Sequence, residues 1–353
     1  VSPDSFGAVT ALSLIAFAYA GGITLISGAV FAGLLSAQAL IPYALDDWFG
    51  LNGNWFLLVG GVLLIFTLLV NPTGVAGDFY RRIHKRPVVR APAVSPETAL
   101  PAAVNPAPER PGRSERSFIL NVTALSVAFG GVRALQEVSL GVRDGELLGL
   151  IGPNGAGKTT LIDAVTGFVR SGGAVELDGA GLGKLPPHER ARRGLARTWQ
   201  GTELFDDLDV RENLTVASRD SAARAAADAA ATLGTLGLDW AADAMPSQLS
   251  SGQRKLVGVA RALAARPKVL CLDEPAAGLD TRESAELGAR LRALADAGQS
   301  MLLIEHDMSL VLGICDRVVV LEFGQVIAEG TPEEVRRDPR VIAAYLGDAS
   351  RAG

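Results

Sequence analysis

One short stretch of this chain has the residue types and spacing needed to bind phosphate groups. It fits the pattern G-x-x-x-x-G-K-[ST], after the apolar residues 147–151 and before the helix-like residues 161–165. Glycines let backbone N–H groups crowd round phosphates, and a helix N-terminus adds partial positive charge. Lys158 would reach the β- and γ-phosphates, and the hydroxyl of Thr159 would bind Mg²⁺. The predicted nucleotide-binding residues are Gly152, Pro153, Asn154, Gly155, Ala156, Gly157, Lys158, Thr159 and Thr160.

Two adjacent acids follow a second apolar run. Residues 268–272 have the composition of a buried strand and lead directly into Asp273 and Glu274. A strand that delivers Asp273 to its carboxyl end suits a carboxylate that holds Mg²⁺ through water. Glu274 is the next residue and is placed to accept a proton from the attacking water. We therefore predict that Glu274 is the general base. The alternative is a structural role, because two acidic residues would also suit a strand that ends in a solvent-exposed turn.

A turn of small polar residues precedes a predicted helix that runs to Ala265. Its residues are Ser250, Ser251, Gly252 and Gln253. Such a turn forms a helix cap and offers a second anion site. It resembles the signature motif of ATP-binding-cassette (ABC) ATPases, in which two glycines follow the serine. Ser251 departs from that pattern, but several small residues occur at this position in the family, so ATP chemistry is expected to survive.

The resemblance to ABC ATPases extends to four further residues. Phe129 resembles the aromatic residue that stacks on adenine, and Gln200 resembles the glutamine that contacts Mg²⁺ and water. Asp280 resembles the aspartate of the loop joining the two active sites, and His306 the switch histidine that holds the γ-phosphate. Considered alone, Phe129, Gln200 and His306 would each be interpreted as structural residues. The order and spacing of all the motifs support the assignment to ABC ATPases. The resemblance implies catalytic roles for Glu274, His306 and Gln200, and Mg²⁺ binding by Thr159, Gln200 and Asp273.

Several longer stretches are similar to the ATPase subunits of branched-chain amino-acid importers. They are residues 129–135, 185–189, 194–200, 305–317 and 344–347. The similarity covers about residues 118–348. The segment 216–247 is shorter than the helical insertion that this resemblance leads us to expect. In the family, that insertion normally docks on the permease.

Composition separates the chain into two unequal parts. Its 353 residues suggest about two domains, and 48% are hydrophobic, with a mean hydropathy of +0.27. Residues 1–80 contain no Lys or Arg and only four acidic residues, so nearly every charged residue lies in the remainder of the chain. No basic excess supports nucleic-acid binding. Cys271 and Cys315 lack metal-ligand spacing, which predicts two buried, reduced thiols.

The apolar N-terminal part is predicted to span a membrane. Residues 5–45 carry no charge, and as one helix they would measure about 60 Å, roughly twice the hydrocarbon thickness, so two segments fit better. Residues 55–70 form a further apolar run, and the basic cluster after it places that end in the cytoplasm. Residues 1–80 also resemble the C-terminal part of the permease of the same importers. Because the chain begins abruptly with Val1, we expect a truncated N-terminus.

These patterns predict three regions. Residues 1–80 form a partial transmembrane permease segment, residues 81–116 a basic, Pro/Ala-rich cytoplasmic linker, and residues 117–353 an ABC ATPase domain. The predicted fold class is an α/β P-loop NTPase domain with a helical subdomain, preceded by a partial all-α transmembrane region. Strands are expected at 119–122, 138–142, 147–151, 268–272 and 301–304, and helices at 222–233 and after Thr331, where a capping box opens the last helix.

The resemblance also implies a mechanism and partners. Two cassettes would close head to tail around two MgATP molecules, the phosphate loop of one facing residues 250–253 of the other. Permease subunits and an extracytoplasmic solute-binding protein complete such importers, which implies a multi-pass protein of the cell membrane with a cytoplasmic ATPase domain. Branched-chain amino acids are the expected substrates, with urea, short amides and other small polar solutes as alternatives. Two alternative functions remain: a soluble ABC ATPase, and a non-transporting fusion that uses its membrane segment as an anchor.

Overall fold

The computed structural model describes residues 117–349, except for residues 200, 202, 203 and 219. The predicted membrane segments and linker, residues 1–80 and 81–116, lie outside the described residues. Within the described part of the chain, no helix combines the length and the apolar content needed to cross a bilayer.

The centre of this region is a six-stranded sheet in the order β10-β9-β3-β8-β7-β6. Its strands are β3 (Leu147–Ile151), β6 (Leu195–Arg197), β7 (Val269–Asp273), β8 (Ser300–Ile304), β9 (Arg317–Glu322) and β10 (Gln325–Gly330). All neighbours run parallel except β9 and β10. Every residue of β3, β7 and β8 is buried, as expected for parallel strands covered on both faces. The predicted parallel α/β sheet is confirmed.

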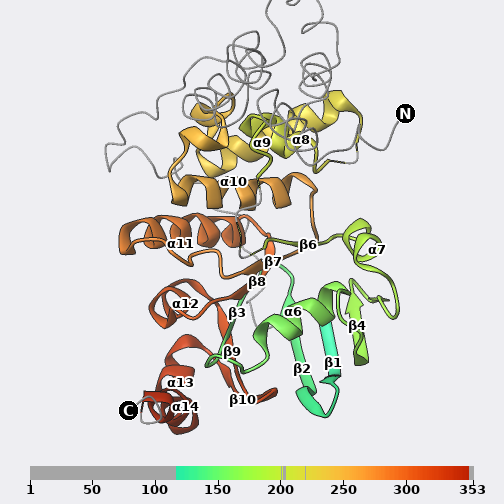
Figure 1. Cartoon of the computed structure of the whole chain (residues 1–353), viewed down its shortest axis with the longest axis vertical. Coiled ribbons are helices and arrows are strands. Elements are labelled where there is room, and N and C mark those ends of the chain that lie inside the picture. Colours follow the sequence, from blue (N-terminus) through green and yellow to red (C-terminus); the bar gives the residue numbers. More distant parts are fainter. Residues whose placement is uncertain (1–116, 200, 202–203, 219, 350–353) are drawn as a thin grey trace, which may run out of the picture. The chain divides into compact units, whose positions relative to one another are not determined.

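A second, antiparallel sheet has the order β2-β1-β4-β5. Its strands are β1 (Phe118–Phe129), β2 (Val132–Arg143), β4 (Gly172–Leu177) and β5 (Ala180–Gly181). The expected strands at 119–122 and 138–142 are therefore parts of two 12-residue strands that form a hairpin. Helix α6 (Lys158–Thr166) packs between this sheet and the central one, and its Leu161 and Ile162 share a core cluster with both (Figure 1).

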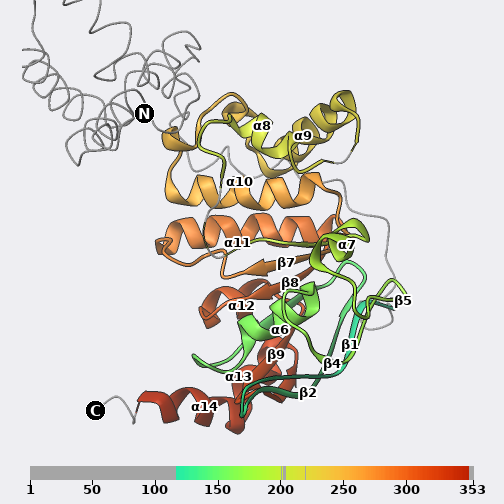
Figure 2. The ribbon, with the colours of Figure 1, turned by 45° about the vertical axis from the view of Figure 1, so that its right-hand side comes forward.

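Helices cover the opposite face of the central sheet. Helices α10 (Ser251–Ala264) and α11 (Thr281–Asp296) lie side by side, and α8 (Val210–Thr215) and α9 (Ala222–Leu236) lie beyond α10 in both views (Figure 2). Helix α10 contacts α8, α9 and α11. Helices α8, α9 and α10 contact one another, in the region where the helical subdomain was predicted. The short helix α7 (Pro187–Arg192) lies between β5 and β6 in the chain, and η3 (Asp239–Ala241) and η4 (Pro246–Gln248) lie between α9 and α10.

The C-terminal segment corrects one expectation. Thr331 and Glu334 form the predicted capping box of α13 (Pro332–Arg337), but this is not the last helix. Helix α12 (Met308–Ile314) precedes β9, and α14 (Pro339–Ala349) follows α13 after a break at Asp338. Pro339 explains the break, since proline lacks an N–H and disfavours helical geometry in the residue before it.

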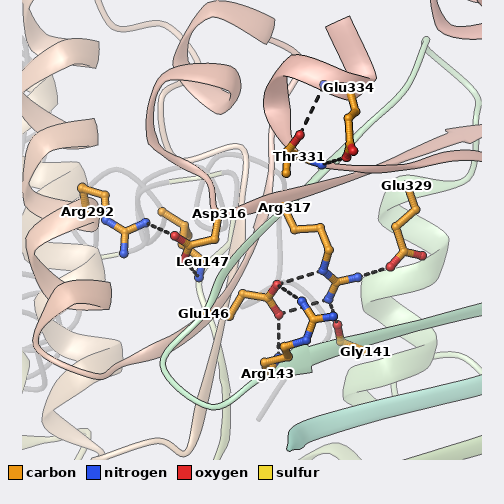
Figure 3. Close-up of polar contacts among 10 residues, drawn as sticks. All are labelled: Gly141, Arg143, Glu146, Leu147, Arg292, Asp316, Arg317, Glu329, Thr331 and Glu334. Atoms are coloured by element: carbon orange, nitrogen blue, oxygen red, sulfur yellow. Dashed lines mark hydrogen bonds and ion pairs between the residues drawn. The ribbon is translucent and has the colours of Figure 1, made fainter. Parts of the chain in front are cut away.

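Charged groups are buried where β9 meets the antiparallel sheet (Figure 3). Arg317 donates from Nε and Nη2 to the two carboxylate oxygens of Glu146 at 2.9 and 3.1 Å. It also pairs with Glu329 and donates to the carbonyl of Gly141, and Glu146 accepts a 2.6 Å bond from the backbone N–H of Arg143. This network joins β2, β9 and β10.

Both cysteines are free and buried, as predicted. Burial raises the pKa of Cys271 to about 12, and likewise that of Cys315 to about 12. The thiols therefore remain protonated at neutral pH, which agrees with a structural role.

Candidate functional site

The predicted phosphate loop connects β3 to α6. Its glycines occupy backbone positions that other residues fit poorly: φ is +155° at Gly152, +79° at Gly155 and +103° at Gly157. A Cβ atom on Gly152 would lie 2.1 Å from the carbonyl oxygen of Leu321, and one on Gly157 would lie 2.7 Å from that of Ala134. The loop is thus wrapped tightly by the strands around it.

Lys158 is the first residue of α6 and is buried. Its ammonium donates to the carbonyls of Gly152 and Pro153 at 2.7 and 3.1 Å, so the side chain lies along the loop. Burial lowers the pKa of Lys158, while the charges of Glu274 and Asp273 raise it. The following Thr159 is exposed at the helix N-terminus. A cation, backbone N–H groups and a hydroxyl therefore converge at one helix end.

The two predicted acids end β7 at the same edge of the sheet. Asp273 is buried, and its Oδ2 accepts a 2.7 Å bond from Nη2 of Arg197. Glu274 has a φ of +46°, a left-handed conformation that is uncommon for residues other than glycine, and its N–H donates to the carbonyl of Ile304 at 2.9 Å. Strands β3, β8 and β7 are parallel and consecutive in the sheet, and the charge of Glu274 lies close enough to raise the pKa of Lys158.

The residues after β8 complete this edge. The side chain of His306 is 59% exposed, whereas that of the preceding Glu305 is fully buried. Oε1 of Glu305 accepts a 2.6 Å bond from the N–H of Ala276, and Oε2 lies 3.7 Å from Nδ1 of His306. Burial raises the pKa of Glu305. Glu305 thus links the loop after Glu274 to His306, and the sequence analysis missed it, although an acid directly after an apolar strand was the same signal as at Asp273.

The predicted signature residues form the N-terminus of α10. Ser250 and Gln253 make a capping box: Oγ of Ser250 accepts from the Gln253 N–H at 3.3 Å, and Oε1 of Gln253 accepts from the Ser250 N–H at 2.9 Å. Ser251 is exposed and Gly252 is buried beside Glu283. Across the described residues, no hydrogen bond or ion pair joins this turn to residues 152–160 of the same chain.

Two of the remaining predicted residues, Phe129 and Asp280, lie on other elements. Phe129 ends β1 and is 54% exposed, which leaves its ring free to stack on a ligand. Asp280 is the N-cap of α11, and its Oδ1 accepts from the Glu283 N–H at 2.8 Å. Gln200 lies outside the described residues. Arg197, three residues before it, is a further charged group at the site that the sequence analysis did not single out.

Comparisons with known proteins agree with this geometry. Residues 135–277 match the family model described as ABC transporter, and residues 325–350 match the one described as Branched-chain amino acid ATP-binding cassette transporter. The chain is 40% identical over 251 residues to the high-affinity branched-chain amino acid transport ATP-binding protein BraF of Pseudomonas aeruginosa, covering 65% of this chain and 98% of BraF.

Other relatives have comparable similarity. LivG of Escherichia coli, also a high-affinity branched-chain amino acid transport ATP-binding protein, is 41% identical over 251 residues, with 65% of this chain and 98% of LivG covered. LptB of the same organism, a lipopolysaccharide export system ATP-binding protein, is 38% identical over 237 residues, with 66% and 98% covered. A crystal structure of a nucleotide-free ATP-binding cassette from an ABC transporter aligns with a TM-score of 0.60 at 31% identity, covering 65% of this chain and 99% of that one.

The fold and the site define an ATP-binding cassette. The chain belongs to the ATP-binding proteins of ABC transporters, and its enzymatic class is an ATPase coupled to transport.

Proposed function

We propose that this chain powers an importer of branched-chain amino acids. The observation that carries the proposal is the match of residues 325–350 to the family model of branched-chain amino acid cassettes. The names of BraF and LivG support the same substrate class. Overall sequence identity alone would not decide the substrate class, because the export protein LptB is almost as similar to this chain as BraF and LivG are.

The site residues are proposed to act as follows. Phe129 stacks on adenine, the loop residues 152–160 cradle the phosphates, and Lys158 binds the β- and γ-phosphates. Glu274 accepts the proton of the attacking water, and His306 holds the γ-phosphate. Residues 250–253 contact the γ-phosphate of a second cassette, with Asp280 at the junction of the two sites. Their lack of a bond to the loop of the same chain is consistent with a head-to-tail dimer.

The donor set suits Mg²⁺. A threonine hydroxyl, a glutamine amide oxygen and a carboxylate, from Thr159, Gln200 and Asp273, are hard oxygen ligands, which Mg²⁺ prefers. The described residues include no group of three acids, histidines or cysteines that could hold a metal by themselves. This is expected where Mg²⁺ is held by one or two carboxylates together with substrate phosphates. When bound, Mg²⁺ neutralises charge on the phosphates.

The N-terminal residues are proposed to be a permease segment fused to this ATPase. Residues 1–80 lack Lys and Arg and contain long apolar runs, and the basic cluster after them would lie in the cytoplasm. The protein would then work at the cell membrane, beside further permease subunits and an extracytoplasmic solute-binding protein. Protease accessibility in sealed vesicles tests this topology: residues 81–116 should be cleaved only from the cytoplasmic side.

Uptake of labelled leucine tests the proposed substrate. Cells carrying the intact locus are compared with cells in which the locus encodes Glu274→Gln. The expected result is uptake that isoleucine and valine compete and that the substitution abolishes. Equal uptake in both strains would contradict the proposal and direct the search to urea and short amides, or to a fusion that does not transport.

A further inference from the structure

Arg197 is the last residue of β6, and its side chain is only 6% exposed. One arm of its guanidinium, Nη2, donates to Oδ2 of Asp273 at 2.7 Å. The other arm, Nη1, is paired with Oδ1 of Asp163 on α6, the helix that begins at the phosphate loop. A single planar cation therefore joins the end of β7 to the helix that carries Lys158.

The guanidinium is also enclosed by aromatic rings. Its central carbon lies 4.2 Å from the ring centre of Trp199 and 5.9 Å from that of Phe168. The two rings pack edge to face, with centroids 5.0 Å apart. Both rings line a cavity of about 620 Å³. The aromatic contacts and the two carboxylates together leave the guanidinium little freedom to rotate.

The side-chain partner of the Asp273 carboxylate is this arginine. The carboxylate is buried, so it needs a hydrogen-bonding partner. The nearby Lys158 instead directs its ammonium to the carbonyls of Gly152 and Pro153. Because Arg197 holds Oδ2, the direction of the other oxygen, Oδ1, is set as well. Partners of this kind, behind a metal-binding carboxylate, tune metal affinity without contacting the metal.

We propose that Arg197 is a positioning residue that orients the Asp273 carboxylate for Mg²⁺, with Trp199 holding the guanidinium in place. The inference rests on the proposed function, in which Asp273 binds Mg²⁺. Arginine suits this role better than lysine because its planar fork can hold two carboxylates at once in a defined geometry.

Metal binding measured without turnover tests the inference. Mn²⁺ replaces Mg²⁺ and is titrated by electron paramagnetic resonance into the purified full chain with a non-hydrolysable ATP analogue. Arg197→Gln should weaken Mn²⁺ binding about tenfold or more, the usual effect of losing such a partner. Arg197→Lys should fall between this variant and the parent. Trp199→Leu should lose about two- to fivefold, the effect of one cation–π contact at a half-exposed site.

Two controls separate this role from general destabilisation. Arg192→Gln makes the same replacement at an exposed position of α7 and should bind Mn²⁺ like the parent. Affinity for the analogue in the presence of EDTA should stay within about twofold of the parent in every variant, because the ion pairs of Arg197 are with Asp163 and Asp273 and not with residues 152–160 of the phosphate loop. In steady-state assays, kcat should fall in Arg197→Gln while the KM for ATP changes little.

The outcomes distinguish the inference from the proposed function. Parental Mn²⁺ affinity in Arg197→Gln, with weakened affinity in Asp273→Asn, would overturn the role of Arg197 and leave Asp273 as a metal ligand. Parental affinity in Asp273→Asn would overturn both assignments. If Arg197→Gln does not fold, the titration is made on Arg197→Lys, and parental affinity there would also overturn the inference.

Discussion

At the scale of single residues, Glu274 combines an unusual backbone with a chemical position. Glu274 comes directly after the buried strand β7 and has a left-handed φ of +46°. Its N–H donates to the carbonyl of Ile304, at the end of β8. Such conformations cost about 1–3 kcal/mol and persist when the surrounding structure holds them. The strain is therefore compatible with a side chain aimed at a reacting group, which the proposed role as general base requires.

Replacing Glu274 with glutamine tests that role. Glutamine keeps the size of the side chain but cannot accept the proton, so steady-state ATP hydrolysis should fall by at least about a hundredfold. ATP binding should remain, and closed dimers should accumulate in size-exclusion chromatography with ATP, because closure depends on ATP and reopening on hydrolysis. Equal turnover by the variant and the parent would remove Glu274 from this role.

Glu305 predicts a pH dependence of stability. Burial raises its pKa above the ordinary 4.5, so the folded state favours the protonated carboxyl more than the unfolded chain does. Its contribution to stability is complete below the ordinary pKa and is lost as the pH rises through the raised value. Glu305→Gln cannot titrate. The free energy of unfolding of the parent should therefore fall relative to that of the variant as the pH rises above 4.5. Parallel curves from denaturation at several pH values would contradict this.

At the scale of elements, the N-terminus of α10 has the same capping box as that of α13. Ser250 with Gln253, and Thr331 with Glu334, each make reciprocal side-chain and backbone bonds. Only the first box belongs to the proposed signature, and the Ser250 hydroxyl also donates to Oε1 of Glu283 at 3.3 Å. The two helices therefore offer comparable N-caps for separating capping from catalysis.

Removing each cap by alanine tests this difference. Ser250→Ala and Thr331→Ala should each lower the free energy of unfolding by about 1 kcal/mol, the usual value for an N-cap. ATP hydrolysis should fall in Ser250→Ala alone, because this hydroxyl is proposed to face the nucleotide of the partner cassette. Parental hydrolysis in both variants would mean that the turn before α10 is a helix cap and nothing more. Thermal unfolding and steady-state ATPase rates provide the two readouts.

At the scale of the whole molecule, the buried network around Arg317 joins strands from both sheets. Its central pair links Arg317 to Glu146, 171 residues apart in sequence. Removing one partner of a buried pair leaves a charge without compensation, which costs about 3–5 kcal/mol. Arg317 also donates to the carbonyl of Gly141, and Glu146 accepts from the N–H of Arg143, both on β2. We therefore expect this network to hold the antiparallel sheet against the central one.

Glu146→Ala tests this expectation by denaturant unfolding of the full chain. The free energy of unfolding should fall by about 3–5 kcal/mol. The matched control is Glu286→Ala, which removes the partner of Arg282 in an exposed pair and should cost less than about 1 kcal/mol. Similar losses of unfolding free energy in both variants would show that the buried Arg317 network stabilises the fold no more than an exposed ion pair does.

The sequence by itself determined the features that are local along the chain. The phosphate loop, the acids after β7 and the capping boxes each lie within a few residues, so their spacing carries their geometry. The parallel sheet was also predictable, because buried strands alternate with helices. By contrast, the strands at 119–122 and 138–142 were expected to be short, whereas the structure has two 12-residue strands joined by Gly130 and Gly131.

Only the tertiary structure decided which distant groups support the site. Arg197 meets Asp163 and Asp273 across 34 and 76 residues, and Glu305 meets Ala276 across 29. These contacts exist because the strand order places β7 between β6 and β8, with their carboxyl ends at one edge. Strand order and register depend on how the whole core packs, and no short stretch of sequence encodes them. The motifs could therefore be located in the sequence, whereas the contacts of Arg197 with Asp163 and Asp273 could not.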